Sequence, residues 1–205
     1  YASCYQDLTE KKYMALEEVI DGYGSRQQFS YLPLTNESIY SKERIVEYPI
    51  SNNRIPYYVV SSLTQISSDN ISLKTDYQYM DLLIHKRGLG VLGFGKVEST
   101  TPTGIRSVQS QTFDSFFFVS DTVVSEVWNG EFLVTEQKQI NSVAYGGSGQ
   151  IVVQPKTIRA DNYLEGTYSV AQYQFDDYGN LIDLIEDKNG TLNIHTSNAG
   201  FFQKG

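Results

Sequence analysis

Short strand-like runs that alternate with turn-forming residues constrain this chain more than any other feature. The runs are rich in Val, Ile, Thr, Tyr and Phe, which suit a pleated and half-buried surface. The turn signals between them are Asp21-Gly22, Asn129-Gly130, Gly146-Gly147, Tyr178-Gly179-Asn180 and Asn189-Gly190. An Asn-Gly pair supplies the positive φ angles that a tight hairpin requires. The sequence therefore predicts an all-β fold, in which antiparallel hairpins form a curved sheet.

The strand prediction can be made segment by segment. The predicted strands are 57–60, 77–84, 93–97, 113–119, 122–128, 132–135 and 150–153. Residues 121–136 are predicted to form one hairpin, closed by Asn129-Gly130. The Ser- and Asn-rich region 61–74 is predicted to be an exposed loop or hairpin tip, and 99–104 to be a turn around Pro102. Only residues 9–20 contain many helix formers, which favour a helix in this segment. The alternative is a strand that enters the Asp21-Gly22 turn.

Composition excludes several classes of function. The 205 residues contain 16 Lys and Arg against 24 Asp and Glu, a net charge of −8, which argues against binding a nucleic-acid backbone. We find no run of 18 apolar residues, so no membrane span is expected. The single cysteine, Cys4, can form neither an internal disulfide nor a site with several thiolate ligands.

Candidate catalytic and binding residues have plainer explanations. The only histidines, His85 and His195, lack partners at metal-binding spacing. A dinucleotide loop would need a helix after its glycines, whereas a strand follows Gly88, Gly90, Gly93 and Gly95, so these are predicted to allow a bulge or a close strand crossing. Adjacent carboxylates such as Asp176-Asp177 and Glu17-Glu18 point to opposite faces of a strand, which disfavours a hydrolase. Lys86 and Arg87 are interpreted as a solvated turn flank, with an anionic partner as the alternative. We expect no catalytic, cofactor-binding or metal-binding residue.

Aromatic residues are abundant, with 16 Tyr, 10 Phe and one Trp. Tyrosine has an apolar ring and a polar tip, so stacked hairpins can line a broad sheet with tyrosine rings. The alternative is a carbohydrate-binding platform that uses exposed tyrosines and Trp128.

One segment has the features of a repeat unit. Tyr173 and Phe175 are predicted to share one face of a strand, because the side-chain period of a strand is two. Asp176 can bond to the backbone downstream, and Gly179 and Asn180 tolerate the left-handed conformation that closes a turn. Residues 181–185 would then form the return strand, and 187–190 the next turn.

This segment resembles the tyrosine–aspartate repeat of the Rhs and teneurin superfamily, with Phe175 in place of a second tyrosine. Upstream motifs resemble the insecticidal toxin-complex B component and its SpvB-like relatives. The residues that carry this resemblance are Asp21, Gly22 and Gly24, then Tyr31 and Pro33, then Tyr77 and Tyr79, and finally Gly88, Gly90, Gly93 and Phe94. Leu89 and Val91 depart from the family's Gly-Arg-Gly-Phe core, and only one clear repeat is present.

The resemblance implies a fold and a role. It implies that residues 14–20 are extended, and that 1–205 form one β-rich unit, with scaffold strands in 1–165 and one repeat in 166–195. It implies a non-enzymatic segment of a secreted or cell-surface bacterial protein, which contributes to a β shell around a C-terminal cargo. Expected partners are the remainder of the parent chain and neighbouring shell or toxin-complex subunits, and an edge-strand homodimer. The alternative is an extracellular glycan- or protein-binding module.

Overall fold

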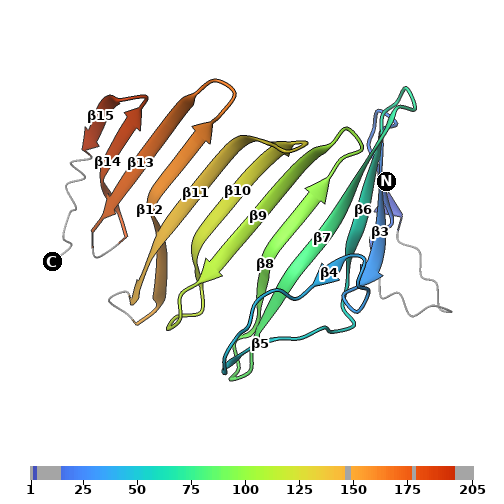
Figure 1. Cartoon of the computed structure of the whole chain (residues 1–205), viewed down its shortest axis with the longest axis horizontal. Coiled ribbons are helices and arrows are strands. Elements are labelled where there is room, and N and C mark those ends of the chain that lie inside the picture. Colours follow the sequence, from blue (N-terminus) through green and yellow to red (C-terminus); the bar gives the residue numbers. More distant parts are fainter. Residues whose placement is uncertain (1, 4–14, 146–148, 177–178, 197–205) are drawn as a thin grey trace. The chain divides into compact units, whose positions relative to one another are not determined.

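The computed structural model describes residues 2–3, 15–145, 149–176 and 179–196, and these residues form strands, turns and loops without a helix. The strands are β1 (Ala2–Ser3), β2 (Glu18–Ile20), β3 (Arg26–Pro33), β4 (Tyr40–Ser41), β5 (Ile50–Asn52), β6 (Tyr58–Ile66), β7 (Ser72–His85), β8 (Gly90–Thr100), β9 (Ile105–Phe113), β10 (Ser120–Asn129), β11 (Phe132–Tyr145), β12 (Ile151–Asn162), β13 (Thr167–Phe175), β14 (Leu181–Lys188) and β15 (Thr191–Thr196) (Figure 1). Strand pairing is antiparallel, apart from β4, which runs parallel to β7. The all-β class with antiparallel hairpins is confirmed.

Strand order follows the chain closely. The main path is β1-β2-β3-β6-β7-β8-β9-β10-β11-β12-β13-β14-β15, while β4 and β5 pair with β7 beside this path. The chain divides into two compact units, Tyr1–Ser107 and Val108–Gly205, and the boundary falls inside β9. The predicted division between scaffold strands (1–165) and a repeat (166–195) stays a prediction.

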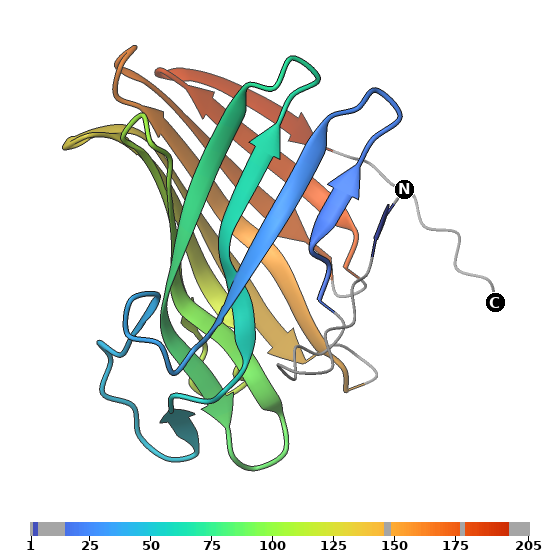
Figure 2. The same cartoon turned by 90° about the vertical axis from the view of Figure 1, so that its right-hand side faces the viewer.

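In the first unit, one edge of β7 pairs with β8, and the other edge is divided between two sets of partners. Its first half pairs with β6, from Ser62↔Asp76 to Ile66↔Ser72. Its second half pairs with β4 at Tyr79 and Met80, and with β5 from Leu83 to His85. The segment 34–57 therefore leaves the β3–β6 hairpin and returns along β7 (Figure 2).

The apolar core of the first unit lies where this segment packs against β7. Leu34, Ile39, Tyr40 and Leu82 are buried together. Partly buried side chains surround them: Leu32, Ile55, Val59, Tyr79, Ile84 and Phe94. Burying such side chains is the main stabilising contribution that a single sheet can obtain from an added segment.

In the second unit, the described strands from β10 onward form consecutive hairpins. At Asn189-Gly190 the φ angles are 52° and 83°, as the predicted two-residue turn requires. The predicted 121–136 hairpin is also present, although Asn129 pairs with Phe132, so the turn itself is Gly130-Glu131 and only Gly130 has positive φ. Among the described residues of this unit, Val108 is the only buried hydrophobic residue.

Three local predictions differ from the structure in the type or the bounds of the predicted segment. The predicted strand 113–119 is wrong: β9 ends at Phe113, and 114–119 form a turn. Of the predicted loop 61–74, only 67–71 lie outside strands, at the tip of the β6–β7 hairpin. Of the predicted extended segment 14–20, Glu18–Ile20 is β2, residues 15–17 have no regular structure, and Met14 lies outside the described residues. Cys4, Gly146, Gly147, Asp177 and Tyr178 also lie outside them.

Candidate functional site

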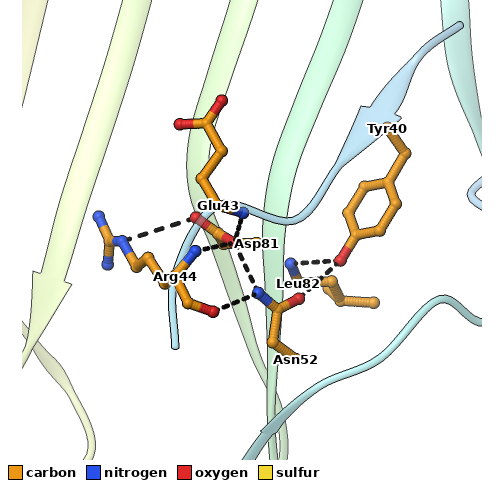
Figure 3. A network of polar contacts seen from close by, with 6 residues as sticks. All are labelled: Tyr40, Glu43, Arg44, Asn52, Asp81 and Leu82. Carbon is orange, nitrogen blue, oxygen red and sulfur yellow. Dashed lines mark hydrogen bonds and ion pairs between the residues drawn. The ribbon is translucent and has the colours of Figure 1, made fainter. Parts of the chain in front are cut away.

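A buried polar network around Asp81 is the most developed cluster of side chains in the first unit (Figure 3). Asp81 lies on β7, between the residues that pair with β4 and those that pair with β5. Only 3% of its surface is exposed, and Asn52 on β5 is also buried. Because an isolated buried carboxylate is costly, its partners decide what the cluster can do.

Asp81 receives its hydrogen bonds from the segment 34–57. Its Oδ1 accepts from the backbone N–H groups of Glu43 (2.8 Å) and Arg44 (3.0 Å), and from Nδ2 of Asn52 (2.5 Å). Its Oδ2 lies 3.7 Å from Nε of Arg44. The Glu43 side chain points away from the network, so Glu43 contributes through its backbone (Figure 3).

Tyr40 extends the network to the backbone of β7. Its hydroxyl donates to Oδ1 of Asn52 (2.9 Å) and accepts from the N–H of Leu82 (3.0 Å). Burial raises the pKa of Tyr40, with a smaller opposing effect from the Leu82 hydrogen bond. The hydroxyl therefore stays protonated and can donate to Asn52 over the physiological pH range.

Backbone geometry at Asp81 is unusual, and a glycine opposite accommodates it. Asp81 has φ of 56°, a left-handed conformation that Asp tolerates better than most residues. A Cβ on Gly95 would lie 3.1 Å from Cβ of Asp81 and 3.1 Å from Cζ of Arg44. Glycine at position 95 therefore leaves room for both side chains.

This arrangement is suited to holding a segment in place. Oδ1 of Asp81 takes three donors from the chain itself, and a buried, multiply bonded carboxylate is strongly coupled to its partners. The network joins Glu43, Arg44 and Asn52 to β7. Sequence reasoning missed it, although an acidic residue inside the apolar run 77–84 was a usable signal.

Residues of the family-like motifs lie at separate turns and strands. At the β2–β3 turn, Oδ1 of Asp21 accepts from the N–H groups of Tyr23 (2.8 Å) and Ser25 (2.9 Å), and these bonds lower the pKa of Asp21. Gly22 lies in the same turn, and Gly24 has φ of 86°. These residues shape a hairpin and bring no reactive groups together.

The tyrosines of the first unit serve packing and long-range hydrogen bonds. The Tyr31 hydroxyl donates to the carbonyl of Leu16 (2.8 Å), and Pro33 ends the same strand. The Tyr79 hydroxyl donates to the carbonyl of Val60 (2.8 Å), and its ring packs at 4.8 Å from that of Phe94. Tyr77 lies two residues earlier on β7.

The predicted bulge near the glycine-rich run is present. The β7–β8 register shifts between Leu83, which pairs with Gly93, and Ile84, which pairs with Val91. Gly88, Gly90 and Gly93 have φ angles of 110°, 76° and 129°. The glycines thus provide turn and bulge geometry in a strand hairpin.

The repeat-like segment forms the predicted turn. The rings of Tyr173 and Phe175 stack at 6.4 Å on one face of β13. Oδ1 of Asp176 accepts from the Asn180 N–H (2.8 Å), and Gly179 has φ of 88°. Among the described residues of this turn, Gly179 has positive φ and Asn180 does not.

The two histidines lie on different strands, His85 on β7 and His195 on β15. His85 is buried, and its Nδ1 accepts from the Leu89 N–H (3.4 Å). Nε2 of His195 lies 3.9 Å from Oε2 of Glu186, and the His195 side chain is exposed. Cζ of Arg87 lies over the Tyr48 ring, 5.9 Å from the ring centroid. The described residues contain no group of three His, Cys, Asp or Glu side chains that could hold a metal ion.

The second unit carries an open groove of about 530 Å³ on its sheet. It spans β10 to β14, and short side chains such as Ser125, Ala160 and Ser169 form its lining. Asp161, at its border, is held by two hydrogen bonds from Arg159 (2.6 and 2.7 Å), which lower the pKa of Asp161. This carboxylate is engaged in an ion pair and is poorly placed to act as an acid or base.

Trp128 bears on the predicted carbohydrate platform. Its indole N–H donates to Oε2 of Glu126 (3.0 Å), and the ring is half-buried. The indole N–H of Trp128 thus already makes a hydrogen bond within the chain.

Residues 1–121 match the family model described as the insecticide toxin TcdB middle/N-terminal region. No curated protein matches. A crystal structure of a porin-like protein from Bacteroides uniformis ATCC 8492 is similar with a TM-score of 0.38 and 8% identity, over 87% of this chain and 69% of that one. A likeness this weak defines neither a shared fold nor a shared function.

Within the described residues, no helix is long and apolar enough to cross a membrane.

The family model covers more than half of the chain, and the resemblance to the toxin-complex B component that the motifs suggested is confirmed. This chain belongs to the insecticide toxin TcdB middle/N-terminal region family.

Proposed function

We propose that this chain is a non-catalytic wall segment of a secreted toxin-complex protein. In this proposal its hairpins contribute to a β shell that encloses a C-terminal cargo, and residues 166–195 act as one tyrosine–aspartate repeat. Neighbouring parts of the parent chain and other toxin-complex subunits would cover its open surfaces.

One observation carries the proposal. The described strands of the second unit form a ladder of hairpins in which Val108 is the only buried hydrophobic residue. A sheet normally buries one face against a second layer, so a sheet with so little apolar core is suited to a wall whose faces other parts of the assembly cover. Long strands such as β11 and β12 give the partition its height.

Two further features are consistent with a wall. The Asp81 network fixes the segment 34–57 against β7 through polar contacts that the chain satisfies itself. At the other end of the strand order, β15 pairs with β14 alone among the described strands, so its outer edge is open to another strand or subunit. Leu192 and Ile194, on one face of β15, are 61% and 62% exposed. In the isolated chain the same edge would favour the predicted homodimer.

Limited proteolysis of the parent protein tests containment. The C-terminal cargo should resist protease in the wild type and become cleavable when the wall is broken by Ala160→Pro, because proline removes a ladder hydrogen bond inside β12. Ala160→Val is the matched control, since a β-branched residue keeps the backbone donor and suits a strand.

The proposal fails if the cargo is equally accessible in the wild type and in Ala160→Pro. It also fails if the purified wild-type chain hydrolyses glycan or peptide substrates, since a passive wall has no such activity.

A further inference from the structure

Strands β10 to β13 contain a regular block of paired residues in the second unit (Figure 1). The block consists of residues 122–127, 135–140, 157–162 and 167–172, which pair across the four strands without a shift in register. Residues that pair directly share a face of the sheet, and neighbours along a strand point to opposite faces. The register therefore assigns every residue of the block to one of two faces.

One face of the block has no charged and no aromatic side chain. Its residues form three rows across the strands, which are Val123↔Gln139↔Ile158↔Ala171, Ser125↔Gln137↔Ala160↔Ser169 and Val127↔Thr135↔Asn162↔Thr167. We call these residues the neutral face.

The opposite face carries every charged residue of the block. Glu126, Glu136 and Asp161 form one row, and Lys138 pairs with Arg159 in the next. We call these five residues the charged face. Asp161 accepts two hydrogen bonds from Arg159, so part of this charge is balanced on the face itself.

The groove of the second unit lies mainly over the neutral face. Most of its lining residues belong to that face, among them Gln137, Ala160 and Ser169. These short or uncharged side chains leave room above the sheet without placing a charge in it.

Charges outside the block border the neutral face. Lys188 continues the row of Ser169 onto β14, and its Nζ lies 3.2 Å from Oε2 of Glu186. Lys156 lies at the register shift next to Thr157. The change from neutral to charged thus falls at the limits of the block.

The two faces differ in what can cover them. A chain laid on the charged face would remove five charges from water, which is costly unless each is paired. The neutral face has no ionic hydration to lose, and it exerts no strong field on charged segments. It also lacks the Trp, Tyr and Arg side chains that dominate binding energy. It is therefore suited to lie against a polypeptide of any sequence without holding it tightly.

We propose that the neutral face is turned towards the enclosed C-terminal cargo, and the charged face towards water. The cargo would touch the wall along the groove through weak, uncharged contacts, which leave it free to depart. This inference rests on the proposed wall function and adds to it the identity of the inner face.

Photo-crosslinking in the intact parent protein tests the orientation. A photoreactive phenylalanine at position 125, on the neutral face, should crosslink to the cargo, whereas the same residue at position 138 should not. Ser125 and Lys138 are both exposed, and Lys138 pairs with Val124, so the two positions differ in face far more than in place.

The outcomes separate this inference from the wall function. Crosslinks to the cargo from position 138 alone would overturn the orientation and leave containment standing. Equal crosslinking from both positions, or none from either while the cargo resists protease, would also overturn it. Loss of protection in Ala160→Pro tests containment by itself.

Salt gives a second, independent readout. The yield from position 125 should be the same at about 0.05 M and about 0.5 M NaCl, because an uncharged contact is not screened. Circular dichroism at both salt concentrations checks that the fold is unchanged. A yield that falls severalfold with salt would show an ionic contact and would contradict a neutral inner face.

Discussion

At the scale of single residues, Asp81 should contribute most to the stability of the first unit. Asp81→Ala would leave three donors without their acceptor and would place Ala at positive φ, so the free energy of unfolding should fall by about 3–5 kcal/mol. Asp81→Asn keeps an acceptor oxygen and tolerates the left-handed backbone, so its effect should be smaller. Urea unfolding monitored by circular dichroism measures both losses.

Asp69→Ala is the control for this series, because Asp69 is exposed in the β6–β7 turn. Its effect should lie within about 0.5 kcal/mol, as is usual for surface substitutions. Equal stability of the Asp81→Ala and Asp69→Ala variants would show that the network does not hold the segment 34–57.

Tyr79 should make stability depend on alkaline pH. Burial, with a smaller contribution from Tyr77, raises its pKa from 10.0 to about 12. Since the folded-state pKa lies above the unfolded one, the contribution is complete below about pH 10 and is lost as pH rises towards 12. The wild type should therefore lose more stability than Tyr79→Phe between about pH 8 and about pH 11 in urea unfolding.

At the lower pH, Tyr79→Phe should lower the free energy of unfolding by about 1 kcal/mol. The substitution removes the hydrogen bond to the Val60 carbonyl, while the ring still packs on Phe94. Tyr57→Phe, at a residue that is 59% exposed, is the control and should match the wild type at both pH values. The interpretation would be wrong if the wild type and Tyr79→Phe lost stability in parallel.

Single residues were the least predictable level from sequence. The Asp176 and Gly179 turn was predicted, because its hydrogen bonds are local and follow from residue type. The Asp81 network was not, because it joins residues up to 42 positions apart. Such contacts depend on how the segment 34–57 folds back on β7, which no local pattern encodes.

At the scale of elements, the Asn189-Gly190 turn should control the β14–β15 hairpin. Gly190 has φ of 83° and open space around its Cβ position, so Gly190→Ala changes conformational preference without a clash. The expected cost is about 1–2 kcal/mol, and amide hydrogen exchange of β15 should accelerate accordingly. Gly22→Ala is the control, because Gly22 also has open space and does not have positive φ. Equal β15 exchange in both variants would contradict a turn-controlled hairpin.

The existence of many strands was predictable, whereas β3 and β9 were not predicted and some strand ends were wrong. Runs of β-branched and aromatic residues identified β6, β7, β8, β10, β11 and β12, and glycine turns separated the hairpins. The prediction failed at 113–119 because the apolar run Phe116–Val119 resembles a strand, while Asp114 turns the backbone through two side-chain hydrogen bonds. A turn-forming aspartate before an apolar run outweighs the propensity of that run.

At the scale of the whole molecule, a wall must present its two faces to different surroundings. Gln137 and Lys138 are adjacent on β11, are both exposed, and point to opposite faces of the sheet. They offer a matched pair of reporters on one strand. Family membership predicted a structural role, and the open faces of the second unit are the feature that a partition needs.

Thiol labelling of this pair tests containment most directly. Gln137→Cys and Lys138→Cys, each in a Cys4→Ser background, would be treated with a bulky maleimide in the isolated 205-residue chain and in the parent protein. We predict similar labelling of both positions in the isolated chain, and protection of one position alone in the parent. Equal labelling of both positions in the parent would contradict a wall that separates inside from outside.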